Sequence, residues 1–458
     1  KRYSLETRKK FKKELNLNRI SLKKISLFLL ILLPFAIIIG QAPSDIIVST
    51  ISILFLLNSI IQKDWSWIKI KWIKIVFFLW IYLIFASFFA LETKIAFSHS
   101  ILFVRFFIFA VALQHWLLSE KKFLTYTLYS LLTAFIFVSI DTFYQFLHFD
   151  LSKGYGPDIL GYYSNDHFRL TGPFRSNIPG AYLSKFFFII FLFSIIKLKK
   201  KNRDNLLFVP LMTFIFFLVF LTGEAMSFAS IVLGLLILFL LEKKFRKKII
   251  CSVIILFFLI PLAVKFNPVW KKIEIIEKNP WHNGTVYQIK MPCENNKNEI
   301  CKKKFKTQPF FYEVLTNFSK SAYWETYSQA LIIWKDHYFF GIGIKNYTGA
   351  CKSEKYKENL KYFFCTTHPH NFYIQWLLET GIIGLIGFIA LLVFWLRYFI
   401  KDINKNVNPL IYSPILTLFV IFWPIMSTGS FFSNRNATMN WFIIALCLAI
   451  ANLRNKKV

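Results

Sequence analysis

Long apolar runs separated by short basic connections are the main pattern of the chain. Twelve runs come close to the roughly 20 residues with which a helix spans a bilayer. They are residues 25–40, 46–61, 73–91, 101–118, 124–148, 178–197, 206–222, 226–241, 249–265, 371–396, 410–427 and 437–453. Because the runs do not alternate apolar with polar positions, a transmembrane β-barrel is not expected. The pattern predicts an all-α polytopic membrane protein with about twelve transmembrane helices, since helices satisfy their own backbone in lipid.

One long polar segment interrupts this pattern between the ninth and tenth runs. The prediction therefore divides the chain into a basic arm at 1–24, nine helices at 25–265, a loop domain at 266–370, and three helices with a tail at 371–458. Within the loop domain, apolar positions recur at helical spacing over 322–335. This spacing predicts a helix that lies on the membrane face or packs over a site.

The basic residues cluster in short connections between the runs. These connections are 62–74, 119–123, 197–203, 243–248 and 397–405. By the positive-inside rule, both termini are expected in the cytoplasm, with 149–177, 223–225, 266–370 and 428–436 on the outer side. The net charge of +32 is then explained by orientation and by attraction to anionic membrane lipids, and a nucleic-acid partner is disfavoured.

Four of the six cysteines, Cys293, Cys301, Cys351 and Cys365, lie in the long outer segment. An even number of cysteines in an oxidising compartment favours disulfides. Proximity in sequence favours Cys293–Cys301 and Cys351–Cys365, although four cysteines allow three pairings. A zinc site is the alternative, but the spacing lacks the C-x2-C pair that is typical of such sites.

Two arginines, Arg169 and Arg175, precede the sixth run in the stretch RLTGPFRSNIPGA. They lie six residues apart across a Gly-Pro turn and can therefore converge on one ligand. Guanidinium groups bind diphosphate through paired hydrogen bonds. The alternative is that both arginines anchor the chain to lipid phosphates at the membrane surface.

Ionisable residues also occur within the predicted helices, where they are costly unless they pair or line a cavity. Asp141 in the fifth run is expected to pair with Arg105 in the fourth. Glu379 in the tenth run is expected to pair or to line a cavity. The spacing of Gly381 and Gly384 predicts the close approach of a neighbouring helix.

His370 and Asn371 stand where the long polar segment meets the tenth run. Pro369 predicts that a helix starts at about these residues, and the free N–H groups at its N-terminus favour an anion. From residue type alone, such a histidine is more often an amphipathic anchor. With Gly381 and Gly384, however, the pair forms the pattern H-[N/S/Q]-x9-G-x-x-[G/T/Y], which closely resembles the signature of the O-antigen ligase and polymerase family.

Two further segments resemble the same family. The stretch RLTGPFRSNIPGA is similar to an arginine-containing segment at the same place in the topology. The stretch LTGEAMSF (221–228) is similar to a turn in which a basic residue follows TGE or TGS. Here Ala225 occupies that place, so Glu224 lacks the neighbour that the resemblance implies, and Arg175 or Arg435 are the candidates to compensate.

The resemblance implies a glycosyltransferase of the bacterial inner membrane that takes a glycan from undecaprenyl diphosphate on the periplasmic face. A ligase delivers the glycan to lipid A–core, whereas a polymerase delivers it to another carrier-linked glycan, and the signature histidine favours the ligase. In this scheme Arg169 and Arg175 hold the diphosphate, and His370 is a general base or orients the diphosphate. Asn371 positions the substrate, and Glu224 and Arg435 complete the binding site.

No metal or cofactor is expected, because the outer connections lack clustered carboxylates for a divalent ion. Arg169, Arg175, Glu224 and His370 are expected to face one cavity below the 266–370 segment. The alternative of another class is a flippase or transporter of lipid-linked oligosaccharides. It would require internal repeats and polar residues in mid-membrane, and the sequence has little of either.

Overall fold

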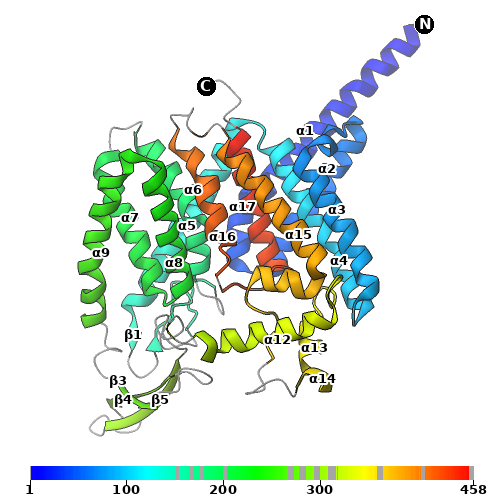
Figure 1. Cartoon of the computed structure of the whole chain (residues 1–458). Coiled ribbons are helices and arrows are strands. Elements are labelled where there is room, and N and C mark those ends of the chain that lie inside the picture. Colours follow the sequence, from blue (N-terminus) through cyan, green and yellow to red (C-terminus); the bar gives the residue numbers. More distant parts are fainter. Residues whose placement is uncertain are drawn as a thin grey trace.

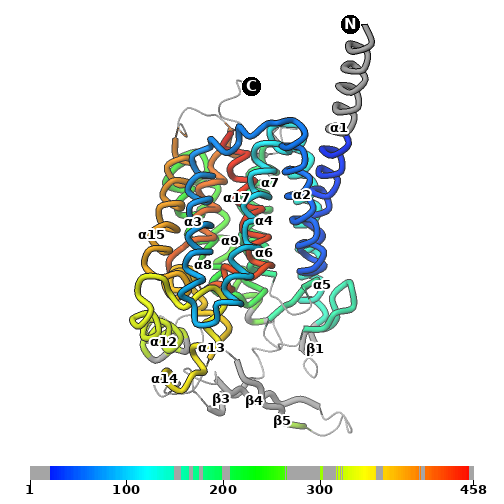
Figure 2. The backbone as a smooth tube through the Cα atoms, turned by 90° about the vertical axis from the view of Figure 1, so that its right-hand side faces the viewer, coloured from blue at the N-terminus to red at the C-terminus, as the bar shows by residue number. Residues whose placement is uncertain are grey.

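The structure is a computed structural model. It describes residues 2–150, 154–164, 169–174, 179–199, 204–266, 273–277, 285–292, 300–307, 316, 318–357, 365–401, 403, 408–425 and 427–452. Each predicted apolar run coincides with a helix, and these helices lie side by side in one bundle (Figures 1 and 2). They are α1 (Arg2–Ile39), α2 (Gln41–Gln62), α3 (Lys71–Ala86), α4 (Thr93–Val111), α5 (Lys121–Leu147), α6 (Pro179–Lys199), α7 (Asp204–Leu221), α8 (Ala225–Leu241), α9 (Arg246–Phe266), α15 (Phe372–Ile400), α16 (Ser413–Phe422) and α17 (Asn434–Asn452).

Seven helices in the described part of the chain are long and apolar enough to cross a membrane. An eighth candidate is the pair α8 and α9, which passes as one span bent by 119°. Leu207–Leu221 and Pro409–Phe422 are shorter apolar helices. The chain is therefore a multi-pass α-helical membrane protein, and the number of about twelve spans stays a prediction.

Helices α6 and α17 form the centre of the bundle. In α6, 78% of the apolar window is buried, against 39–50% in the other six candidate spans. In α17, every residue from Ala437 to Ala451 is buried. A helix that is apolar on all sides is buried on all sides. Polar residues in these two helices, such as Lys185 and Asn440, therefore face protein and not lipid.

The smaller elements lie at one end of the bundle, opposite the end that holds the start of α1 and the end of α17 (Figure 1). We call it the loop end. Its helices are α12 (Ala322–Asp336), α13 (Tyr347–Lys352) and α14 (Glu354–Lys357). Its strands are β1 (Phe149–Asp150), β2 (Gly154–Tyr155), β3 (Ile273–Glu277), β4 (Thr285–Pro292) and β5 (Ile300–Thr307), with β3, β4 and β5 in one antiparallel sheet. These strands were not predicted.

Helix α12 confirms the helix predicted over 322–335. It begins after Ser321, whose hydroxyl oxygen accepts a hydrogen bond from the N–H of Trp324 at 3.2 Å and so caps the helix. The helix lies across the loop end, at a steep angle to the bundle (Figure 1).

The predicted disulfide Cys351–Cys365 is present, with 5.9 Å between the two Cα atoms. It joins α13 to the segment that leads into α15. Cys301 is also disulfide-bonded. Its predicted partner, Cys293, lies outside the described residues, so the Cys293–Cys301 pair stays a prediction.

Candidate active site

Asn371 caps the start of α15. Its Oδ1 accepts hydrogen bonds from the N–H groups of Tyr373 (2.9 Å) and Ile374 (3.2 Å), and its Nδ2 donates to the carbonyl of Pro424 (2.6 Å). This is the arrangement that satisfies the free N–H groups of a helix N-terminus. The side chain is buried and its amide is engaged at both ends, so Asn371 is suited to fixing the position of His370.

Two histidines, His368 and His370, stand at this helix start, with ring centroids 4.2 Å apart. Thr428 binds both residues. Its N–H donates to the carbonyl of His370 at 2.8 Å, and its carbonyl accepts from Nε2 of His368 at 3.1 Å. Because a carbonyl can only accept, the second bond places a proton on Nε2 of His368. Sequence reasoning missed His368, although the repeat HPH was a visible signal.

His370 has a backbone φ of 55°, in the left-handed region. A non-glycine residue there is uncommon and persists where its surroundings fix it. Here the fixing contacts are the cap of Asn371 on one side and the hydrogen bond from Thr428 on the other. The imidazole therefore leaves the backbone in a direction that the fold sets.

Both imidazoles are neutral at neutral pH. Burial lowers the pKa of His368 to about 4, and burial also lowers the pKa of His370, while the Thr428 backbone opposes both shifts. The positive charge of Lys345 adds to the lowering of the pKa of His368. A neutral imidazole can accept a proton from a hydroxyl, but it carries no charge with which to hold a diphosphate.

Helix α12 packs over the histidines. The ring of Tyr323 stands edge-on to that of His370, with 6.3 Å between their centroids. Tyr327, one turn further along α12, hydrogen-bonds to the side chain of Asn371, and burial raises the pKa of Tyr327 to about 12. Of the two positions predicted for the 322–335 helix, the structure therefore shows packing over a site, here over His370 and Asn371.

Gly381 breaks α15 in the first half of the helix, with φ 68° and ψ −175°. The backbone of the segment that follows α12 fills the break, and the N–H of Ile342 donates to the carbonyl of Leu378 at 2.9 Å. A Cβ atom at Gly381 would come within 2.0 Å of the carbonyl oxygen of Phe339. Glycine is therefore required for the backbone conformation, and not chiefly for the helix packing that we expected.

Close helix packing does occur at Gly384, where a Cβ atom would lie 3.1 Å from Tyr82 on α3.

Glu379 lies on α15 between Gly384 and the histidines. It is buried, and both of its carboxylate oxygens accept hydrogen bonds. Its Oε2 accepts from the N–H of Lys345 at 3.1 Å, and its Oε1 accepts from Nε2 of Gln375 at 3.2 Å. Glu379 thus joins α15 to the loop end.

Glu224 lies partly buried in the turn before α8, where the positive charges of Arg169 and Lys185 act on its carboxylate. The hydroxyl of Ser227 and the N–H of Ala181, at the start of α6, also hydrogen-bond to its carboxylate. Burial raises the pKa of Glu224, and these four neighbours oppose the rise. This carboxylate and its two cations form a second polar group at the same end of the bundle.

Sequence reasoning missed Lys185, although an ionisable residue inside an apolar run was a signal. Its side chain is 5% exposed, and its Nζ donates to Oδ1 of Asn440 on α17 at 3.1 Å. Ala225 brings no charge to the turn, but the charge of the buried Lys185 acts on Glu224 from α6.

The expected pair between Arg105 and Asp141 is wrong. Nη2 of Arg105 lies 3.1 Å from Oδ2 of Asp45, which also accepts from Nδ2 of Asn434 at 2.6 Å. The reason is the packing of the helices: α4 lies against α2, at whose start Asp45 stands. Asp141 on α5 instead lies against the 154–164 stretch.

Helix α5 holds the backbone around Arg169. Oδ1 of Asp141 accepts from the N–H of Ile159 at 2.9 Å. One turn along, Oε1 of Gln145 accepts from the N–H groups of residues 171 and 172, both at 2.9 Å. Asp141 and Gln145 thus position the stretch that carries Arg169.

Arg435 lies against the stretch that carries Arg169. Its guanidinium carbon lies 5.6 Å from the ring centroid of Phe174, at the end of the described stretch 169–174. Arg435 starts α17, which follows the segment of Thr428. Arg175 lies outside the described residues, so the single cavity predicted for the arginines, Glu224 and His370 stays a prediction.

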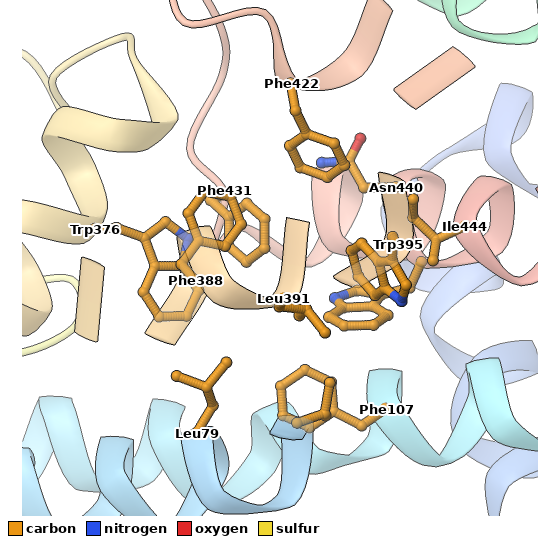
Figure 3. A pocket seen from close by; sticks show the side chains of 12 residues that line it. Leu79, Phe107, Trp376, Phe388, Leu391, Trp395, Phe422, Phe431, Asn440 and Ile444 are labelled. Carbon is orange, nitrogen blue, oxygen red and sulfur yellow. The ribbon is translucent and has the colours of Figure 1, made fainter. Parts of the chain in front are cut away.

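An apolar cavity lies deeper in the bundle, and Asn440, the partner of Lys185, is the polar residue in its lining. It is lined by Val76, Leu79, Phe107, Trp376, Phe388, Leu391, Trp395, Phe422, Phe431, Asn440, Trp441 and Ile444. Figure 3 shows Trp376, Phe388 and Phe431 grouped at one side and Asn440 beside Phe422. The lining is mostly aromatic, and this cavity is therefore part of the core.

The polar groups at the loop end combine neutral imidazoles with cations and one carboxylate. Among the side chains that the structure describes, no three or more histidines, cysteines, aspartates and glutamates are grouped so as to hold a metal ion. A neutral base together with cations suits a reaction in which a hydroxyl loses a proton and an anionic group departs.

Comparison with known families gives one match. Residues 210–389 match the sequence model of the family described as O-antigen ligase. The matched range contains Glu224, His370 and Glu379, and it ends before Arg435. No curated protein matches the chain.

Proposed function

We propose that the protein is an O-antigen ligase, because residues 210–389 match the sequence model of that family. It transfers a glycan from undecaprenyl diphosphate to lipid A–core, without a metal or cofactor, on the periplasmic face of the bacterial inner membrane. The loop end is the periplasmic end in this proposal, and both termini are cytoplasmic. Basic connections at 197–203 and 243–248 support this orientation.

His370 acts as the general base. Its imidazole takes the proton from an acceptor hydroxyl while that oxygen bonds to the anomeric carbon of the glycan. The bond from this carbon to the diphosphate oxygen breaks, and the carrier diphosphate leaves with the electron pair. The lowered pKa of His370, caused by burial, supports this role over that of an anion binder.

Arg169 and Arg175 hold the diphosphate and stabilise the charge that develops on it as it departs. Glu224 and Arg435 complete this part of the site. Glu224 orients Arg169, and Arg435 reaches the same stretch through Phe174. Asn371 keeps His370 at the start of α15.

The observation that carries the proposal is the neutral imidazole pair fixed by Thr428 at the capped start of α15. Such a group has the protonation state, the fixed position and the aromatic cover of a general base. It lies inside the family match, and the cations that suit an anionic leaving group occupy the same end of the bundle.

The test uses purified protein with undecaprenyl-diphosphate-linked glycan and lipid A–core, with and without EDTA. Glycosylated lipid A–core in both conditions is the expected result. Elongated carrier-linked glycan instead would identify a polymerase of the same family. Transfer that EDTA abolishes and magnesium restores would reject the metal-independent scheme. Movement of the carrier across vesicles without any transfer would support a flippase.

A further inference from the structure

Gln375 lies one turn below Asn371 on α15 and is 1% exposed. Each polar atom of its amide is engaged. Nε2 donates to Oγ of Ser430 (2.9 Å) and to Oε1 of Glu379 (3.2 Å), and Oε1 accepts from the N–H of Phe431 (2.7 Å). A buried amide with this many partners is costly to disturb.

Ser430 and Phe431 belong to the short segment between α16 and α17 that also contains Thr428. This segment is the one that binds the histidines, through the N–H of Thr428 to His370 (2.8 Å) and its carbonyl to His368 (3.1 Å). The segment has no helical or sheet hydrogen bonds of its own at residues 427–430. Its position therefore comes from bonds to other parts of the chain, and Gln375 supplies two of these bonds.

Glu379 sets the direction of the Gln375 amide. A carboxylate can only accept, so it selects the orientation in which Nε2 of Gln375 points toward it. The amide oxygen is thereby turned to the N–H of Phe431. Because Oε2 of Glu379 is bound to the N–H of Lys345, the carboxylate is held in turn by the loop end.

We infer that Gln375 is a positioning residue for His368 and His370, which acts through the 428–431 segment, and that Glu379 fixes its orientation. The inference rests on the proposed function, because it concerns the geometry of the proposed base. A shift of the segment would rotate the imidazole pair away from the acceptor hydroxyl, and a displacement of about 1 Å can cost about 10²-fold in rate.

Substitutions at the pair provide the test. Gln375→Met keeps the volume and removes the hydrogen bonds, and Gln375→Glu places two carboxylates together. The exchange Gln375→Glu with Glu379→Gln restores every bond: the carboxylate now at position 375 would accept from Phe431 and Ser430, and the amide now at position 379 would bridge to Lys345. The matched control is Gln329→Met, a buried glutamine on α12 that binds the carbonyl of Tyr356 at 2.9 Å and does not touch the 428–431 segment.

Two readouts separate the positioning role from general damage. In transfer assays, both single variants at Gln375 are expected to lose about tenfold or more in kcat, with KM for the carrier-linked donor changed less than about threefold. The exchange variant should recover kcat to within about threefold of the native protein. In mass spectrometry after treatment with diethyl pyrocarbonate, the rate of modification of His368 and His370 should rise in Gln375→Met and fall back in the exchange variant.

The inference is overturned if the exchange variant is no better than Gln375→Glu, or if Gln375→Met behaves like Gln329→Met in both readouts. If the native protein shows no transfer at all, the proposed function fails. The modification rates still decide whether Gln375 positions the histidines, because they do not depend on a substrate.

Discussion

The two polar groups at the loop end are built in different ways. At the histidine end (His368, His370, Asn371 and Thr428), short hydrogen bonds fix backbone and side chains on several sides. At the arginine end (Arg169, Lys185 and Glu224), the charges of two cations act on one carboxylate, and Oε2 of Glu224 has no hydrogen-bond partner among the described residues. Proton transfer depends steeply on distance, whereas the attraction between charges falls slowly with distance. The comparison suggests that the histidine end controls geometry and the arginine end controls charge.

The largest effect is expected at the histidine end, from His370→Ala. Loss of a general base typically lowers the rate by about 10²–10⁴-fold, and the drop should appear in kcat. Binding of the carrier lipid should be nearly unchanged, because it rests on the arginine end. Transfer kinetics and carrier binding to the purified protein measure both. The control is His337→Ala, a loop-end histidine at the end of α12. Full activity at saturating substrate in His370→Ala would make this histidine an anchor only.

Substitutions at the arginine end should change the stability of the protein more than the geometry of the site. Glu224→Ala is expected to lower the free energy of unfolding by about 3 kcal/mol, because the donors Ser227 and Ala181 lose their acceptor and the charge of the buried Lys185 is no longer offset. Lys185→Met in the same protein should recover part of this loss, because the unpaired buried cation is then gone. Thermal unfolding of the native protein, of each single variant (Glu224→Ala and Lys185→Met) and of the double variant in detergent measures the coupling. Strictly additive losses would mean that Glu224 and Lys185 do not form a pair.

The Cys351–Cys365 disulfide is expected to stabilise the histidine end but not the arginine end. It closes a loop with a sequence separation of 14 residues, for which the chain-entropy estimate is about 3 kcal/mol. In Cys351→Ser with Cys365→Ser, hydrogen exchange should therefore speed up in α13 and at the start of α15 and stay slow around Glu224. Cys251→Ser, which removes a free exposed cysteine, is the control. Equal acceleration at both ends would show that the two ends unfold as one unit.

Changes of charge at the arginine end should change the affinity for the carrier diphosphate. Arg169→Ala is expected to weaken binding of the carrier diphosphate by about 10- to 100-fold, the usual loss for a hydrogen bond to a charged group. Ala225→Arg should strengthen binding, because it returns a cation to the turn. The control is Arg246→Ala, at the start of α9. Unchanged affinity in Arg169→Ala would place the diphosphate elsewhere.

The sequence predicts best what depends on local pattern. The helices follow from apolar length, the start of α15 follows from Pro369 and Asn371, and the Cys351–Cys365 bond follows from proximity in the chain. The partner of Arg105 could not be predicted, because it depends on which helices are neighbours.

The rest of the site also depends on distant parts of the chain. From the sequence, Gly381 is expected to serve helix packing. Its role in a helix break appears only in the structure, where the backbone of Phe339 fills the break. The neutrality of the imidazole pair depends on burial under α12 and on Thr428, about 60 residues further along the chain, and no local pattern predicts either.

The smallest effect is expected from pH near neutrality. Burial keeps the pKa of His370 below the ordinary value of 6.5 and that of His368 at about 4, so both rings stay neutral as pH falls from about 8 to 7. Activity should therefore be nearly flat in that range and decline only as pH falls through the lowered pKa of His370, with an acid limb of kcat/KM centred below 6.5. The unfolded chain binds protons at about 6.5 and the folded chain does not, so stability should also fall as pH decreases below that value. A pH profile of kcat/KM and of thermal unfolding measures both. An acid limb centred above 6.5 would mean that the base is charged and solvated, and the contrast between the histidine end and the arginine end would be lost.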